Sequence, residues 1–88
     1  MYLHLGMNTV VRTDSIVGIF DMDNSTESKW TRAMLSRAQR EGYLITVGED
    51  VPKSFILCQD ETGYRVYLSQ LNTATLRQRA AEPAIVTE

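Results

Sequence analysis

The sequence predicts a small α+β domain, with a mainly antiparallel sheet and one central helix in the order βββαβββ, followed by a weak C-terminal helix. Three observations predict this fold class. First, three short apolar runs separated by turn residues precede any helical pattern. Second, an amphipathic helical pattern follows and ends at Gly42. Third, two later apolar runs flank a tight turn. With 88 residues, the chain is expected to form one domain with a small core.

The first three strands are expected within residues 1–6, 10–13 and 16–23. A turn from Gly6 to Asn8 separates the first two of them, because glycine and asparagine favour turn conformations. Strands therefore precede the first helix.

The central helix is expected to follow Asp23 and to run to Gly42, since a left-handed glycine commonly closes a helix. Asn24 is the expected N-cap, with Glu27 three residues later as in a loose capping box. Two neighbouring residues are alternative caps: Ser25 and Thr26.

A helical projection divides this helix into an apolar face and a basic face. The expected core face holds Trp30, Met34, Leu35 and Ala38. The opposite face holds Lys29, Arg32, Ser36 and Arg40, with Arg37 at its edge. One face is therefore expected to enter the core and the other to meet solvent.

Three more strands are expected after the helix. Residues 43–47 are typical of a buried strand, and residues 48–52 of a loop. Strands over residues 54–59 and 64–68 are expected to pair, because residues 60–63 begin with aspartate and end with glycine, which suits a type I hairpin turn.

A short C-terminal helix is expected over residues 71–81, with Asn72 or Thr73 as its N-cap. It offers only modest apolar contacts, from Leu71, Ala74 and Leu76. Pro83 is expected to end this helix and to leave residues 84–88 as a frayed tail.

The expected organisation is one domain over residues 1–71, with a short helix and tail over residues 72–88. The stability that so small a core gives a single subunit is marginal, and self-association is therefore expected.

A single cysteine allows no internal disulfide, and neither a leader nor a bilayer-length apolar run is recognisable. We therefore expect a cytoplasmic homo-oligomer without membrane contact. Because the net charge is −2, any nucleic-acid site must be a local patch.

One acidic motif resembles a catalytic one. The apolar run that ends at Asp21 and Asp23 is similar to the aspartate motif of haloacid dehalogenase phosphatases, but the further strands and motifs of such an enzyme are missing. An EF-hand loop does not fit either, since Thr26 and Arg32 stand where glycine and a bidentate acid are required. The preferred interpretation is that the carboxylates end a strand and cap the helix.

The other reactive side chains are His4 and Cys58, each the single residue of its type. His4 is expected on the strand surface opposite Leu3 and Leu5. Cys58 is expected to be a buried, inert thiol at the end of an apolar run. We therefore expect no enzymatic activity, no small-molecule substrate, no metal site and no cofactor.

The positively charged helix is the remaining chemical feature. Its cations are Lys29, Arg32, Arg37 and Arg40, offset only by Glu27 and Glu41. On a lone helix, such a face is most simply a solvated surface. Repeated around an oligomer, the same cations would contact many phosphates of one duplex and hold it by avidity.

The opening segments, residues 1–6, 10–13 and 16–23, together with residues 53–57, resemble the extracellular matrix regulatory protein family (RemA/RemB-like), and most of all its RemB-like branch. The likeness reaches to about Gln70. It implies an α+β fold related to LytTR-type DNA-binding domains, without enzymatic activity or cofactor. By resemblance, the better-understood RemA-like branch forms rings of subunits and activates biofilm matrix genes by binding repetitive DNA.

The sequence departs from the RemA-like branch in its DNA-binding loop. By resemblance, that branch carries an arginine pair in the loop after residues 43–47, where this chain has Val51 and Pro52. Valine and proline offer no donor to a phosphate, and Glu49 and Asp50 would repel the duplex. This loop cannot bind DNA in the same way.

A second arginine of that branch falls at Ser15, and Arg12 is nearby but not equivalent. We therefore expect the DNA contacts to be made by other cations: Lys53, Lys29, Arg32, Arg12 and Arg40.

The expected function is that of an oligomeric DNA-binding regulator of biofilm and extracellular matrix genes that contacts backbone phosphates. A ring-forming adaptor that has lost DNA binding is the alternative, with a protein partner at the acidic Glu49–Asp50 loop and the Asp60–Glu61 turn. A subunit interface is a further alternative role for Tyr2, Tyr64, Tyr67 and Arg65, although the tyrosines suit the sheet core equally well.

Overall fold

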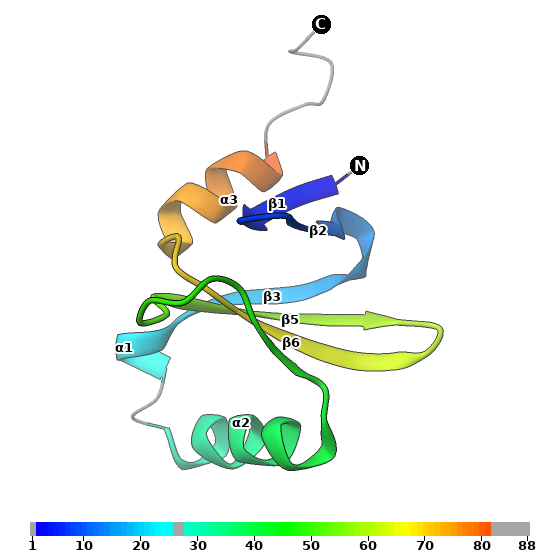
Figure 1. Cartoon of the computed structure of the whole chain (residues 1–88), viewed down its shortest axis with the longest axis vertical. Helices are drawn as coiled ribbons and strands as arrows, with labels where there is room; N and C mark the ends of the chain where they lie inside the picture. Colours follow the sequence, from blue (N-terminus) through cyan, green and yellow to red (C-terminus); the bar gives the residue numbers. More distant parts are fainter. Residues whose placement is uncertain (1, 26–27, 82–88) are drawn as a thin grey trace, which may run out of the picture.

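A computed structural model describes residues 2–25 and 28–81. Its elements form three layers, with a two-stranded hairpin and a C-terminal helix on one side of a four-stranded sheet and a second helix on the other side (Figure 1). The predicted α+β class and the order of strands about a central helix are confirmed. The strands form two sheets, however, where the sequence predicted one.

The first sheet is the hairpin of β1 (Tyr2–Gly6) and β2 (Thr9–Arg12), with the turn where it was predicted. Met7 takes a positive φ of 49° in that turn. A 3₁₀ turn (Thr13–Ser15) then changes the direction of the chain, so that the hairpin lies over the second sheet and does not extend it.

The second sheet has the order β3-β5-β6-β4. It consists of β3 (Ile16–Asp21), β5 (Ser54–Asp60), β6 (Gly63–Ser69) and β4 (Leu44–Thr46). All of its pairs are antiparallel except β4 with β6, so the mainly antiparallel character is confirmed. At the β5–β6 turn, Asp60 Oδ1 accepts a hydrogen bond from the Thr62 amide at 2.8 Å, which agrees with the predicted hairpin.

A strand forms within residues 43–47 as predicted, but the prediction that this strand is buried is wrong. β4 is an edge strand that pairs only with β6, and both Ile45 and Thr46 are exposed. Tyr43 and Leu44 are half-buried. Of residues 43–47, Val47, just beyond the strand, is the one that is fully buried, and its amide donates to the Leu68 carbonyl at 2.8 Å. Apolar composition alone did not distinguish a central strand from an edge strand.

The predicted helix start at Asn24 is also wrong, because two helices take the place of one. α1 (Met22–Ser25) begins directly after Asp21, whose carboxylate accepts from the Asp23 amide at 2.8 Å. α2 (Lys29–Glu41) has its own N-cap, Ser28. The alternative cap Thr26 and the predicted capping partner Glu27 lie outside the described residues.

The two ends of α2 follow from local hydrogen bonding. The Ser28 hydroxyl oxygen accepts from the Thr31 amide at 3.4 Å, which satisfies one of the free donors of the first turn. At the other end, Gly42 adopts a left-handed φ of 85°, and its amide donates to the Ala38 carbonyl. The predicted helix end is therefore confirmed.

The core face of α2 is narrower than predicted. Ala38 is fully buried, and Met34 and Leu35 are half-buried against the sheet. Trp30, which was expected in the core, is 66% exposed, whereas Thr31 is buried. Trp30 lies at the border of the apolar arc, and a side chain in that position is left at the edge of the contact between the helix and the sheet.

The last helix, α3 (Thr73–Ala81), begins at Asn72, whose side-chain oxygen accepts from the Thr75 amide at 2.8 Å. Leu76 is fully buried against β1 and β3, and Arg77 donates to the Ile19 carbonyl at 2.7 Å. The contacts of α3 are therefore larger than the modest ones expected. Pro83 and the tail lie outside the described residues.

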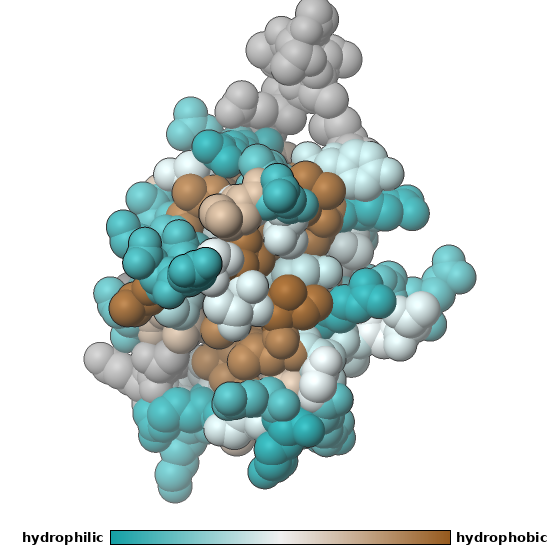
Figure 2. Space-filling view, viewed as in Figure 1, coloured by the Kyte–Doolittle hydropathy of each residue, from teal (hydrophilic) through white to brown (hydrophobic). Residues whose placement is uncertain are grey.

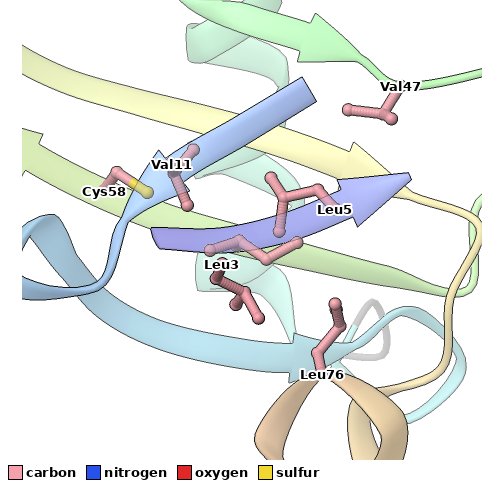
Figure 3. Close-up of a cluster of buried hydrophobic side chains, with 7 residues drawn as sticks. Leu3, Leu5, Val11, Val47, Cys58 and Leu76 are labelled. Atoms are coloured by element: carbon pink, nitrogen blue, oxygen red, sulfur yellow. The ribbon is translucent and has the colours of Figure 1, made fainter. Parts of the chain in front are cut away.

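Each face of the four-stranded sheet has its own hydrophobic cluster. The hairpin-side cluster contains Leu3, Leu5, Val11, Val47, Ile56, Cys58 and Leu76 (Figure 3). The helix-side cluster is built on Ala38, Phe55 and Val66. Phe20 stacks on Phe55 at a ring-centroid distance of 4.9 Å. Neighbouring residues of β5 thus enter opposite clusters, as strand geometry requires.

Candidate nucleic-acid interface

The outer face of α2 presents a row of cations. Lys29, Arg32 and Arg40 are all exposed. At 3.6 residues per turn they lie within an arc of about 80°, and at 1.5 Å per residue the row is about 16 Å long. Hydrophilic side chains gather at this end of the molecule (Figure 2). The structure thus brings three of the predicted site residues onto one surface.

Acidic residues within α2 are limited to Glu41, against four cations. Its carboxylate lies 2.8 Å from Arg37 Nε, four residues earlier, and this hydrogen bond together with the charge of Glu41 raises the pKa of Arg37. This ion pair lies at the edge of the basic face, so α2 keeps an excess of positive charge.

Arg12 does not lie on the surface formed by the helix cations. It ends β2 in the hairpin layer, on the opposite side of the four-stranded sheet from α2 (Figure 1). Its guanidinium forms an ion pair with Asp14 at 2.9 Å. The structure therefore separates this predicted contact from Lys29, Arg32 and Arg40.

Lys53 lies in the connection that leads into β5, and its side chain is exposed. Its backbone is fixed on both sides, because its amide donates to the Ser69 carbonyl at 2.8 Å and its carbonyl accepts from the Met22 amide at 3.0 Å. The connection before β5, α1 and the start of α2 lie at the same end of the molecule (Figure 1). Lys53 therefore lies in the part of the molecule where α2 begins, at the level of the sheet.

The loop between β4 and β5 is held by a side chain that the sequence did not single out. With its amide oriented to satisfy both donors, Gln70 Oε1 accepts from the amides of Glu49 and Asp50 at 2.8 and 2.6 Å. Gly48 precedes them with a left-handed φ of 86° and lies against the Gln70 amide. Val51 is 82% exposed beyond this anchor. The loop therefore presents two acids and an apolar side chain.

Two further depressions flank the β5–β6 turn, and the sequence indicated neither of them. A groove of about 760 Å³ between α2 and this turn, called the helix groove here, is lined by Trp30, Met34, Tyr43, Leu57 and Tyr64, with Ala33, Arg37, Glu41 and Thr62. A cleft of about 580 Å³ on the hairpin side includes Tyr2, Arg12, Arg65 and Tyr67 among its lining residues. Trp30 lies about 100° from Lys29 around the axis of α2, and this position was the sequence signal that could have indicated the helix groove.

The side chains with catalytic potential lie apart from the basic row: Asp21, Cys58 and His4. Asp21 ends β3 and caps α1, in agreement with the preferred interpretation. Cys58 is buried, and burial raises the pKa of its thiol. His4 is exposed, with Nε2 2.8 Å from the Met7 carbonyl oxygen. Within residues 2–25 and 28–81, no three or more His, Cys, Asp or Glu side chains are grouped to hold a metal ion.

Across the described ranges, no helix has the length and apolar character needed to cross a bilayer.

Fold and surface together define a small, three-layered α+β domain whose most distinctive chemical feature is an exposed basic helix. The family model described as RemA-like, extracellular matrix regulatory protein A-like, matches residues 2–80. The chain is also 34% identical, over 80 residues, to extracellular matrix regulatory protein B of Bacillus subtilis (strain 168), an alignment that covers 91% of this chain and 90% of that protein.

The chain belongs to the RemA-like family of extracellular matrix regulatory proteins. The predicted family is thereby confirmed. The match continues past Gln70 to residue 80, so that it takes in most of α3 as well as the sheets.

Proposed function

We propose that this protein is an oligomeric, DNA-binding regulator of extracellular matrix and biofilm genes. Family membership supports the regulatory role. The observation that carries the DNA contact is the row of exposed cations on α2, which bears one acidic residue against four basic ones. Contacts of lysine and arginine with phosphate give affinity without reading bases.

The proposed contact surface consists of Lys29, Arg32 and Arg40, extended by Lys53. Arg12 is left out, because it lies across the sheet and is paired with Asp14. A few cations per subunit bind weakly, but an assembly repeats them along one duplex, and each added contact raises the effective affinity. Self-association is therefore part of the proposal.

The loop at Val51 and Pro52 supports a different use of the surface from that of the RemA-like branch. Val51 is exposed but has no donor, and the neighbouring Glu49 and Asp50 are exposed acids. In the proposed arrangement, the duplex follows α2 and avoids the acidic part of this loop, since like charges repel.

A second candidate is an adaptor that assembles in the same way but binds a protein partner. The exposed acids of the anchored loop, Glu49 and Asp50, together with exposed Val51, favour this candidate. The two functions differ in salt dependence. Phosphate binding weakens steeply as salt rises, because each neutralised phosphate releases counterions, whereas a protein contact centred on Val51 with two acids beside it is expected to weaken much less.

The deciding experiment is fluorescence anisotropy of a labelled duplex titrated with the protein over a salt series. The parent is expected to lose affinity with salt by about 0.9 log units per decade for each phosphate neutralised. The double variant Lys29→Ala plus Arg32→Ala should weaken binding and flatten this dependence. Ser36→Ala, on the same face but without loss of charge, is the matched control and should behave like the parent. Absence of binding at low salt would reject the DNA function.

A further inference from the structure

The two edges of the four-stranded sheet differ in their protection. At the β3 edge, α3 contacts the strand, and Arg77 donates to the Ile19 carbonyl at 2.7 Å. At the β4 edge, no described residue outside the ladder with β6 forms a hydrogen bond with the strand, and Leu44, Ile45 and Thr46 are all uncharged. Natural proteins usually protect an exposed edge with a charged side chain, a proline or a covering element, because it can pair with another chain. The β4 edge therefore has the features of a pairing site.

The backbone groups on the free side of β4 belong to two residues. The Tyr43 carbonyl and the Val47 amide both form hydrogen bonds with β6, at 2.9 and 2.8 Å. Alternate residues of a strand bond to the same neighbour, so Ile45 also faces β6, whereas the amides and carbonyls of Leu44 and Thr46 point outward. Each of these two residues thus offers a donor and an acceptor to an added strand.

The free side of β4 is accessible from solvent. Ile45 is 36% exposed, and the neighbouring Thr46 is exposed. In Figure 1, the green chain that leaves α2 passes in front of β6, and Figure 2 shows the same side of the molecule. Apolar residues lie across the middle of this side, between hydrophilic residues above and below (Figure 2). The open edge therefore lies on the surface of the molecule.

The charge beside this edge indicates the chemistry of its partner. Glu49 and Asp50 are exposed acids just beyond the end of β4, and their amides are held by Gln70. Within the described ranges, neither carboxylate has an ion pair. The cation of the same loop, Lys53, lies at the other end, where β5 begins. The β4 end of the loop is therefore acidic and attracts positive charge.

We propose that the open edge of β4 binds an extended, basic segment of a partner protein, which joins the sheet as a fifth strand. Main-chain hydrogen bonds to Leu44 and Thr46 hold this segment, and its lysine or arginine side chains are selected by Glu49 and Asp50. An antiparallel segment is favoured, because antiparallel pairing is the more stable per residue. Its basic residues then come first and its apolar residues second.

This inference goes beyond the proposed DNA contact and gives the second candidate function its class of partner. The β4 edge and the basic row of α2 share no residue, so the two surfaces can be tested separately. A strand added at β4 also leaves Lys29, Arg32 and Arg40 in place.

A labelled peptide tests the inference without DNA. The probe has two lysines, one glycine and a short run of alternating valine and threonine, and its match has glutamates in place of the lysines. Fluorescence anisotropy is expected to show that the parent binds the lysine peptide about tenfold more tightly, since like charges repel at the acidic loop. The double variant Glu49→Gln plus Asp50→Asn keeps the backbone amides and should remove this preference.

Two changes at one residue test the strand pairing. Thr46→Pro removes an outward amide that takes no part in the β6 ladder, so it should abolish binding of the lysine peptide. Thr46→Val keeps the amide and the branched shape, and as the matched control it should bind like the parent. Protection of the buried Cys58 thiol from a thiol reagent checks that every variant is folded.

Four results would overturn the inference. They are absence of peptide binding to the parent, equal affinity for the two peptides, parental binding by folded Thr46→Pro, and a smaller sedimentation mass for folded Thr46→Pro than for the parent. The last would mean that a second copy of the chain occupies the edge. A parent that binds the lysine peptide but no duplex would reject the DNA function alone, and one that binds a duplex but no peptide would reject this inference alone.

Discussion

The two faces of the four-stranded sheet are built differently. On the hairpin side, two strands and α3 enclose a cluster of seven buried residues. On the helix side, α2 and Met22 of α1 cover a cluster of three fully buried residues with a half-buried border. The more enclosed cluster lies under the hairpin, and the row of cations lies on the less enclosed side.

The difference implies a division of roles. Hydrophobic stabilisation grows with the apolar area removed from water, so the hairpin layer is expected to contribute more to the stability of the domain. α2 buries less apolar surface and presents charge. Changes under the hairpin should therefore affect folding, and changes on the outside of α2 should affect binding.

The largest predicted effect is the loss of stability in Leu5→Ala. Leu5 is fully buried between the hairpin and the sheet, so its truncation leaves a cavity and is expected to cost about 2 to 5 kcal/mol of unfolding free energy. Urea denaturation followed by circular dichroism measures it. Met34→Ala, at the half-buried border of the helix-side cluster, should cost less. Equal losses would contradict the difference between the two faces.

A second prediction concerns two glycines with nearly the same backbone conformation. Gly42 ends α2 with a φ of 85°, and Gly48 follows buried Val47 with a φ of 86°. A left-handed alanine costs about 1 to 2 kcal/mol at either position. At Gly42 the new Cβ meets open space, but at Gly48 it meets the Gln70 amide that anchors the β4–β5 loop.

Gly48→Ala should therefore lower the unfolding free energy by more than Gly42→Ala, in the same denaturation experiment. The double variant Gly48→Ala plus Gln70→Ala is the control, because it removes the obstructing amide. If both single variants lose the same free energy, Gln70 does not anchor this loop.

A third prediction compares one cation on each side of the sheet. Arg40 is in the last turn of α2, and Arg79 is in the last turn of α3. Arg40→Ala should reduce the slope of log affinity for DNA against log salt by about 0.9, the contribution of one phosphate contact. Arg79→Ala removes the same charge from the hairpin side and should leave the slope unchanged. The reverse result would place the duplex against the hairpin layer.

Much of the fold was predictable because its signals are local. The glycine at residue 42, the Asp60 to Gly63 turn and the alternation around His4 each depend on neighbouring residues, and each prediction is confirmed. The errors concern long-range packing. The exposure of Trp30 depends on how α2 lies on its face of the sheet, and that of Ile45 depends on how far the hairpin layer covers the edge strand on the other face. An amphipathic or apolar pattern contains neither piece of information.

The candidate site divides in the same way. Lys29, Arg32 and Arg40 share a helix face by periodicity alone, so the sequence was sufficient to group them. Whether Arg12 belongs with them depends on the hairpin lying across the sheet from α2, which is set by tertiary structure. The anchoring of the β4–β5 loop by Gln70 joins it to residues 20 and 21 positions earlier, and no spacing rule indicated it.

The smallest predicted effect is the pH dependence of stability that arises from Cys58, which lies in the hairpin-side cluster. Burial raises the pKa of this thiol above its ordinary value of 9.0, so the folded state holds the proton more tightly than the unfolded state. The corresponding stability is present below about pH 9 and is lost as the pH rises through the folded-state pKa. Cys58→Ala should remove this alkaline decline, as followed by urea denaturation from pH 8 upward.

Thiol labelling in native buffer extends the same prediction to the two faces. Labelling of Cys58 requires the hairpin-side cluster to open, because the side chain is only 5% exposed. Leu76→Ala removes a neighbour from that cluster and should speed labelling, whereas Met34→Ala acts on the other cluster and should speed it less. Equal acceleration by both variants would mean that the domain opens only as a whole, and the two faces would then differ in composition but share one cooperative unit.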